Sequence, residues 1–435
     1  MLPKKLNVLM IAHYYPPINS SGAKRFQYLS QYFAEDGVEV SVFTTQKTSE
    51  DGEFSERIPV GVNIFEFDSF GRLASSVDNG KQFVPLYSDK PSFKRRFKDF
   101  VMSLCGQLPD PRLPFALSFL LRTPTAQVRK AIESADVIIA TSPPWSMLLA
   151  GLILKSRYKK KLVLDYRDHF SYCHEMPGNF IAKKLEYFVD RWLVSKADLV
   201  VTISEPMRKY YSKFDSDVHV VSNGYDFESM EKARLASAEI DSKRNTVNIR
   251  YMGIVSDGRI PRNFISALNK LSLHEPTKFE KIKIEFYGNA GLLRRFLAEN
   301  YPNLLKIFHF SDFVSYHESL KLMIESDYLL FSETSNIKDI SAQGILTTKV
   351  FEYVGSGRPI LADISIDTLP GKLVSSCSDR NLVSLSTDDF YNKISSAEFY
   401  EVQSAEVSEM AMLYTRKNQS VLYKKILEEL LGHDK

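Results

Sequence analysis

The stretch Leu6–Thr44, LNVLMIAHYYPPINSSGAKRFQYLSQYFAEDGVEVSVFT, predicts the fold class of this chain. It begins with Leu6–Ala12, a short continuous apolar run that is typical of a strand buried on both faces of a parallel sheet. Ala23–Asp36 then places apolar residues at helical spacing, and Val38–Thr44 is a second strand-like run. A strand, a helix and a strand within about 35 residues form a βαβ unit, so we expect an α/β protein with parallel sheets.

The same alternation continues on both sides of a polar segment, Glu231–Asn245, which we interpret as a linker. It predicts two doubly wound, Rossmann-like domains, at residues 1–230 and 246–400, whose facing sheets would enclose a cleft. A terminal segment, residues 401–435, contains one long expected helix, Val407–Leu431. The further expected strands are Val62–Phe67, Asp136–Thr141, Lys161–Tyr166, Asp198–Ile203, Val218–Val221, Val247–Met252, Lys283–Tyr287, Leu305–Phe310, Asp327–Phe331 and Pro359–Ala362.

Composition excludes several classes of protein. The formal net charge of +3 over 435 residues gives no indication of a nucleic-acid partner. Cys105, Cys173 and Cys377 lie far apart and lack metal-ligand spacing, which favours free thiols in a reducing compartment. No apolar segment approaches the roughly 18 residues needed to span a bilayer, so we expect a soluble or peripheral protein.

One segment suggests contact with a membrane. Lys90–Leu104 places lysines and arginines among phenylalanines at helical spacing. A basic amphipathic helix of this kind can lie on an anionic membrane surface. The alternative is a solvated helix that packs its phenylalanines on its own domain.

The stretch Gly344–Ile364, GILTTKVFEYVGSGRPILADI, is the candidate active site. We expect a helix from Thr347 to Tyr353, with Lys349 and Glu352 three residues apart on one face. These two side chains could form an exposed ion pair. They could instead bind a nucleotide, with Lys349 on phosphate and Glu352 on the ribose hydroxyls.

Six motifs in order make the chain resemble the retaining glycosyltransferase family four, most closely its bacterial members that build surface polysaccharides. The resemblance implies the GT-B fold, in which two Rossmann-like domains face each other across a cleft. It also implies transfer of a sugar, with retention, from a nucleotide-diphosphate sugar to a saccharide or lipid-linked acceptor. The expected location is the cytoplasm or the inner face of the plasma membrane. The motifs are YYPPINSSGAKRFQYLSQYF, ATSPPWS, LDYRDHF, VVSNGYD, YMGIVSDGR and TKVFEYVGSGRPIL.

The resemblance also implies roles for individual residues. Arg259 and Lys349 would stabilise the leaving diphosphate without a metal or other cofactor, because no Asp-x-Asp pair stands at an expected strand end. Asp168 would position the acceptor or act as its base; it could instead pair with Arg167 or cap a turn. The residues implied in donor binding are Gly22, Gly253, Arg259, Lys349 and Glu352, those in acceptor binding are Arg25, Asp168 and His169, and those in catalysis are Asp168, Arg259 and Lys349.

Two departures keep other functions open. The family places a glutamate eight positions before the ribose-binding one, where this chain has Gly344, and a basic residue after the first donor-domain glycine, where it has Ile254. One alternative is a non-catalytic assembly factor that binds nucleotide sugar, and another is a GT-B-type epimerase. The terminal helix would cross back to the N-terminal domain, as in the family, or it would form a dimer.

Overall fold

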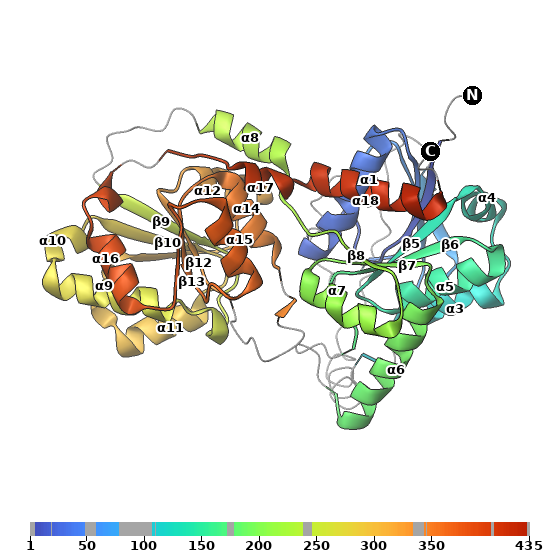
Figure 1. The fold of residues 1–435 in the computed structure, drawn as a ribbon, viewed down its shortest axis with the longest axis horizontal. Coiled ribbons are helices and arrows are strands. Elements are labelled where there is room, and N and C mark those ends of the chain that lie inside the picture. Colours follow the sequence, from blue (N-terminus) through green and yellow to red (C-terminus); the bar gives the residue numbers. More distant parts are fainter. Residues whose placement is uncertain are drawn as a thin grey trace. The chain divides into compact units, whose positions relative to one another are not determined.

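A computed structural model describes residues 5–18, 20–47, 58–77, 107–108, 110–171, 178–237, 246–333, 343–344, 346–401 and 404–432. The chain divides into two compact units (Figure 1). The first contains Met1–Ser222 and Gln419–Lys435, and the second contains Asn223–Asn418. The predicted Lys90–Leu104 membrane segment lies outside the described residues.

The first unit is built on an eight-stranded sheet with the order β4-β3-β2-β1-β5-β6-β7-β8. All neighbouring strands pair in parallel except β3 and β4, which are antiparallel. The strand order reverses between β1 and β5, so a crevice for ligands is expected at their carboxyl ends. The strands are β1 (Asn7–Ile11), β2 (Glu39–Thr45), β3 (Val62–Phe67), β4 (Leu73–Val77), β5 (Val137–Ser142), β6 (Lys161–Tyr166), β7 (Leu199–Thr202) and β8 (Val218–Val220).

Apolar residues cover both faces of this sheet, as the near-continuous hydrophobic strands predict. Alternate β1 residues face opposite cores, because side chains of a strand alternate in direction. Val8 and Met10 pack with α1 and with the end of α18, whereas Leu9 and Ile11 pack with α3 and α5. The helices of this unit are α1 (Ser21–Glu35), α3 (Leu113–Leu121), α4 (Ala126–Ser134), α5 (Ser146–Tyr158), α6 (Phe180–Lys196), α7 (Glu205–Tyr211) and most of α18 (Arg416–Leu431).

The second unit holds a six-stranded, wholly parallel sheet with the order β11-β10-β9-β12-β13-β14. Its order reverses between β9 and β12. The strands are β9 (Val247–Met252), β10 (Ile282–Tyr287), β11 (Phe308–Ser311), β12 (Tyr328–Phe331), β13 (Ile360–Asp363) and β14 (Leu382–Ser384). The helices are α8 (Phe227–Ala236), α9 (Arg262–His274), α10 (Pro276–Phe279), α11 (Gly291–Asn300), α12 (Tyr316–Ile324), α14 (Thr348–Ser356), α15 (Leu369–Cys377), α16 (Thr387–Ser395) and α17 (Glu409–Leu413).

Several predicted bounds are corrected. Helix α8 extends into the start of the expected linker, Glu231–Asn245, and its Met230 and Ala233 are buried in the core of the second unit. The N-terminal part of the first unit ends at Ser222 rather than at residue 230, and the second unit extends to Asn418 rather than to residue 400. The sequence of Glu231–Asn245 has no obvious apolar stripe, so the helix at its start was not predicted.

The single helix expected over Val407–Leu431 is also wrong. The chain forms α17, then α18 from Arg416, with Thr415 between them pairing with Tyr225 in an isolated β-bridge. The backbone groups used in this pairing are unavailable to a continuous helix. Residues from 419 onward belong to the first unit, where Tyr423, Ile426 and Leu427 are buried beside Phe33.

Candidate functional site

The strongest candidate site in the second unit surrounds Lys349 at the point where the strand order reverses. Lys349 lies in the first turn of α14, and its Nζ donates to the hydroxyl of Tyr251 at 2.8 Å. The same ammonium lies 4.0 Å from the centre of the Tyr251 ring and 5.2 Å from that of Phe331. Tyr251 belongs to β9 and Phe331 ends β12, so the cation stands at the carboxyl ends of the two strands that flank the reversal.

The beginning of α14 offers further groups for an anion. Its N-cap residue, Thr347, makes no side-chain hydrogen bond to the first turn. The N-terminus of a helix carries backbone N–H groups and a partial positive charge, both of which favour phosphate. By contrast, the start of α9 is capped by Asp363, which accepts from the amides of Asn263 at 2.8 Å and Phe264 at 3.1 Å. Of these two helices, α14 has the better-suited terminus.

Tyr353 fixes α14 against the strands. Its buried hydroxyl accepts a hydrogen bond of 2.8 Å from the amide of Met252, and burial raises its pKa well above the ordinary tyrosine value. The next residue, Gly253, has φ +110°, and Gly288 has φ +127°. A Cβ at Gly288 would lie 2.5 Å from the carbonyl oxygen of Gly253, so the two glycine loops touch only because this side chain is absent.

Glu352 is largely buried and lies 3.8 Å from Arg416, which is in turn 2.9 Å from the carbonyl oxygen of Gly224 through Nε. The predicted ribose ligand therefore already has a cationic neighbour within its own unit. Arg416 is far away in sequence, and no spacing pattern pointed to it. A carboxylate beside an arginine can accept several hydrogen bonds, so the ion pair does not by itself exclude a ribose.

Arg259 is paired with Glu333, and its Nε donates to the carboxylate of that residue. Glu333 comes shortly after β12, following Ser332, and is buried, so a carboxylate lies close to the cation that was expected to meet diphosphate. Its place just after an apolar strand was the signal that sequence reasoning did not use. Gly344, where the family carries a glutamate, is buried.

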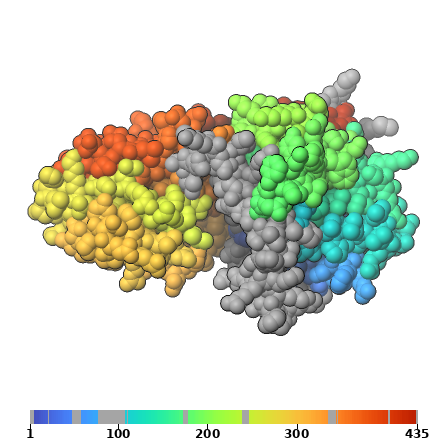
Figure 2. Space-filling model, turned by 90° about the horizontal axis from the view of Figure 1, so that it is seen from below, coloured from blue at the N-terminus to red at the C-terminus, as the bar shows by residue number. Residues whose placement is uncertain are grey.

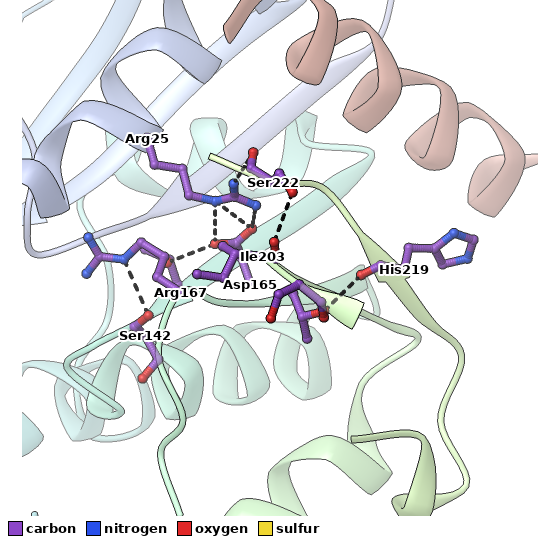
Figure 3. Close-up of polar contacts among 10 residues, drawn as sticks. Arg25, Ser142, Asp165, Arg167, Ile203, His219 and Ser222 are labelled. Atoms are coloured by element: carbon purple, nitrogen blue, oxygen red, sulfur yellow. Dashed lines mark hydrogen bonds and ion pairs between the residues drawn. The ribbon is translucent and has the colours of Figure 1, made fainter. Parts of the chain in front are cut away.

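In the first unit, Arg167 connects the start of α1 with the carboxyl end of β5. Its guanidinium donates to the carbonyl oxygens of Ser142, Pro143 and Gly22 (Figure 3 draws the Ser142 contact). A Cβ at Gly22 would lie 2.7 Å from Arg167 Nη1. The close approach of Arg167 thus explains a glycine at this position, which weakens the implied role of Gly22 in donor binding. Burial lowers the pKa of Arg167, opposed by the charges of Asp168 and Asp165.

Arg25 was expected to contact the acceptor, but it forms a buried bidentate ion pair with Asp165 (Figure 3). Its Nε and Nη2 lie 3.1 and 2.8 Å from the two carboxylate oxygens, and Nη1 donates to the carbonyl of Ser222 at 3.1 Å. Thr141 also donates to Asp165. This arrangement corrects the acceptor-binding role, because the guanidinium is buried among protein acceptors.

Asp168 and His169 follow β6 but have opposite environments. Asp168 is exposed, beside the buried Arg167. His169 is 5% exposed and packs on the rings of Tyr210 and Tyr211 at 4.9 and 5.7 Å. Its predicted contact with the acceptor is corrected to a role in the core. Asp168 is the residue of the LDYRDHF motif that can meet a ligand.

Within the described ranges, no group of three His, Cys, Asp or Glu side chains is arranged to hold a metal ion. No helix in the described part of the chain combines the length and hydropathy of a membrane span.

Residues 22–229 match the family model for Glycosyltransferase Family 4, and most of that range lies in the first unit. No curated protein sequence matches the chain. The match nevertheless agrees with the resemblance of the motifs in this half.

Solved structures match over nearly the whole chain. Sucrose-phosphate synthase from Thermosynechococcus elongatus has a TM-score of 0.61 at 12% identity, over 99% of this chain and 100% of that one. Anabaena HepE in complex with UDP and glucose has a TM-score of 0.55 at 13% identity, over 98% and 100%. A putative UDP-N-acetylglucosamine 2-epimerase from Listeria monocytogenes has a TM-score of 0.53 at 11% identity, over 99% and 98%. With the two parallel sheets, these likenesses confirm the predicted α/β fold of two Rossmann-like domains, as found in GT-B glycosyltransferases.

Proposed function

We propose that this protein is a retaining glycosyltransferase that uses a nucleotide-diphosphate sugar. The acceptor would be a saccharide, lipid-linked in the form that the motif resemblance favours, in the assembly of a bacterial surface polysaccharide. The family match of the first half and the UDP-bound HepE structure support this class of reaction. The proposed location is the cytoplasm or the inner face of the plasma membrane.

The observation that carries the proposal is the environment of Lys349. Its ammonium stands where the second sheet reverses its order, beside the uncapped first turn of α14. Departure of a nucleoside diphosphate develops negative charge, which a fixed cation and aligned backbone N–H groups stabilise. Glu352 follows one turn later on the same helix and would receive the ribose hydroxyls. Arg259 would add a second positive group if the diphosphate displaces it from Glu333.

Asp168 is the proposed group for the acceptor. Transfer requires the acceptor hydroxyl to be oriented and to lose its proton, which a carboxylate can accept. Asp168 is exposed just after β6, beside the buried guanidinium of Arg167. Arg167 would act as a positioning residue, since its guanidinium is hydrogen-bonded to three backbone carbonyls.

A direct test is to incubate the protein with a panel of nucleotide-diphosphate sugars and isolated lipid-linked saccharides, and to identify the products. Transfer that requires an acceptor, with the donor's anomeric configuration preserved in the product by NMR, is expected. An inverted product would refute retention. Release of nucleotide with an epimerised sugar and no acceptor would refute transfer and favour the epimerase, whose fold this chain shares.

A nucleotide-sugar-binding protein without activity is the second candidate. Two observations favour it: the buried Gly344 in place of the family's glutamate, and the pairing of Arg259 with Glu333. In that case calorimetry would detect binding of the donor, and no product would form with any acceptor.

A further inference from the structure

Helix α6 carries a second apolar face that no described part of the first unit covers. Ile181, Leu185, Phe188 and Trp192 follow one another at steps of four, three and four residues, so they form a single stripe on the helix. Their exposed fractions run from 47 to 76%, and Phe180 at the start of the helix is 80% exposed. Figure 2 views the chain from the side on which α6 (green) lies. A contiguous patch of this kind on a monomer marks an interaction site.

The opposite face of the same helix is firmly anchored, so the exposed stripe has a fixed direction. Buried Asp190 accepts from the hydroxyl of Tyr166 at 2.7 Å and from the amide of Ser171 at 3.1 Å. Buried Glu186 accepts from the amide of Gln107 at 2.6 Å. Leu193 belongs to the core of the unit. The core-facing side of α6 is therefore the opposite one, and the exposed stripe is a second face of a packed helix.

The charges of α6 are divided between these two faces. Its acidic residues, Glu186 and Asp190, are fully buried, whereas Lys184, Arg191 and Lys196 are exposed. At 100° per residue, Lys184 and Arg191 lie on one side of the apolar stripe and Lys196 lies on the other. The exposed surface of the helix is thus apolar in the middle, cationic at both margins and free of acidic side chains.

We propose that α6 docks the first unit on an anionic lipid bilayer, with its axis in the plane of the membrane surface. Aromatic and aliphatic side chains would enter the boundary between headgroups and acyl chains, where Trp and Phe are favoured, while the marginal cations meet anionic headgroups. A second copy of the chain fits less well, because a two-fold interface would bring identical cationic margins together. The proposal goes beyond sugar transfer, and binding to lipid is measured without a donor or an acceptor.

The chain provides its own probe of this contact. It has two tryptophans, of which Trp145 is buried and Trp192 lies within the stripe. Adding vesicles of phosphatidylglycerol and phosphatidylcholine should shift the fluorescence of Trp192 to shorter wavelength, and brominated acyl chains should quench it. The Trp192→Phe variant, which retains Trp145, should show neither change. Vesicles of phosphatidylcholine alone, or high salt, should weaken the response, because surface charges are screened.

Variants separate the apolar and the cationic contributions. Leu185→Ser/Phe188→Ser should lower vesicle affinity at least about tenfold, and Lys184→Ser/Arg191→Ser about 30-fold. The matched controls are Leu235→Ser/Leu273→Ser, which alters exposed leucines of the second unit, and Arg129→Ser/Lys130→Ser, which alters exposed cations of α4. All four proteins should unfold at the wild-type temperature, because the altered side chains are exposed.

Three outcomes would overturn the proposal. One is the absence of binding by wild type to anionic vesicles, and another is an equal loss of affinity in the controls. The third is a wild-type dimer in analytical ultracentrifugation that Phe188→Ser converts to a monomer, with no vesicle binding by either form. Failure of sugar transfer would leave vesicle binding unaffected, so the two proposals fail separately.

Discussion

Lys349 owes its position to two aromatic rings from neighbouring strands, Tyr251 and Phe331. A lysine ammonium is a compact charge that suits phosphate, and the Tyr251 hydroxyl directs it. The position of this ammonium at a strand end supports phosphate binding more strongly than the motif alone, because the two rings fix its location.

Replacing Lys349 with Met should lower affinity for a nucleoside diphosphate about 10- to 100-fold, since a charge-assisted hydrogen bond contributes about 1.5–3 kcal/mol. Isothermal titration calorimetry measures the change. Lys372→Met, which removes an exposed lysine of α15, is the matched control and should bind as wild type does. Equal affinity in all three proteins would contradict the assignment.

Glu352 can be tested by asking which part of the nucleotide it contacts. Glu352→Ala should weaken binding of a nucleoside diphosphate by about 1.5–3 kcal/mol, but leave the affinity for its 2′,3′-dideoxy analogue unchanged, because the ribose hydroxyls are the proposed partners. Arg416→Met removes the other member of the ion pair and serves as the control. If both variants lose only stability, and bind both ligands equally, Glu352 is a structural partner of Arg416.

At the scale of an element, one of the groups that anchor α6 is a buried carboxyl group with an unusual pKa, that of Asp190. Burial raises the pKa of Asp190 from 3.8 to about 6, although hydrogen bonds from Ser171 and Tyr166 act in the opposite direction. The folded state therefore binds the proton more tightly than the unfolded chain does. The stability that this proton contributes is complete below about pH 4 and is lost as the pH rises through about 6.

Asp190→Asn should remove this pH dependence. The full difference corresponds to about 3 kcal/mol, the energy of roughly two pKa units. Urea unfolding at several values between pH 4 and pH 7 would show a smaller fall in the free energy of unfolding for the variant than for wild type. Identical slopes for the two proteins would place the titration elsewhere. Asp198→Asn, at a half-buried aspartate whose pKa is lowered, is the matched control and should leave the slope almost unchanged, because a carboxyl with a lowered pKa titrates below this pH range.

The end of the chain is the second element with a testable role. Tyr423, Ile426 and Leu427 of α18 are buried in the core of the first unit, and Tyr423 contacts Phe33. Burying one such side chain stabilises a fold by about 1.5–3 kcal/mol, so three together rival the stability of a typical domain. Deleting residues 419–435 should expose β1, β2, β7 and β8 to hydrogen exchange.

A single substitution tests the same packing of α18 without removing the helix. Ile426→Ala should lower the free energy of unfolding by about 2–5 kcal/mol, whereas Val421→Ala, at a position 60% exposed, should have little effect. If the amides of Leu6–Thr44 keep their protection in the truncated protein while an oligomer dissociates, α18 is a dimerisation helix.

At the scale of the whole molecule, we expect the proposed chemistry to proceed without a metal ion. Lys349, Arg259 and the first turn of α14 would supply the positive charge that a divalent cation supplies in other transferases. EDTA should therefore leave the rate of sugar transfer unchanged, as measured by release of nucleoside diphosphate. Loss of activity in EDTA, with recovery on addition of magnesium or manganese, would contradict this prediction.

Local patterns determined much of this protein. Each fully buried parallel strand needs a short apolar run, and each crossover needs an amphipathic helix, so β1, β3, β6 and β9 could be located from sequence almost to the residue. The same patterns identified the α/β class, the candidate helix that carries Lys349 and Glu352, and the loop that carries Asp168. They missed the edge strands β4 and β14, which are short and partly polar.

Only the tertiary structure decided the partners of these residues. Arg25 with Asp165, Arg259 with Glu333, and Glu352 with Arg416 are pairs separated by 64 to 140 positions, and no local period encodes such contacts. Asp168 and His169 are adjacent in sequence, but only the structure showed that Asp168 is exposed and His169 is buried. Burial also revealed the exposed stripe of α6, because the sequence of a helix that is apolar on two faces does not show which face packs on the core. Burial depends on what packs against each face, and that is a property of the folded chain.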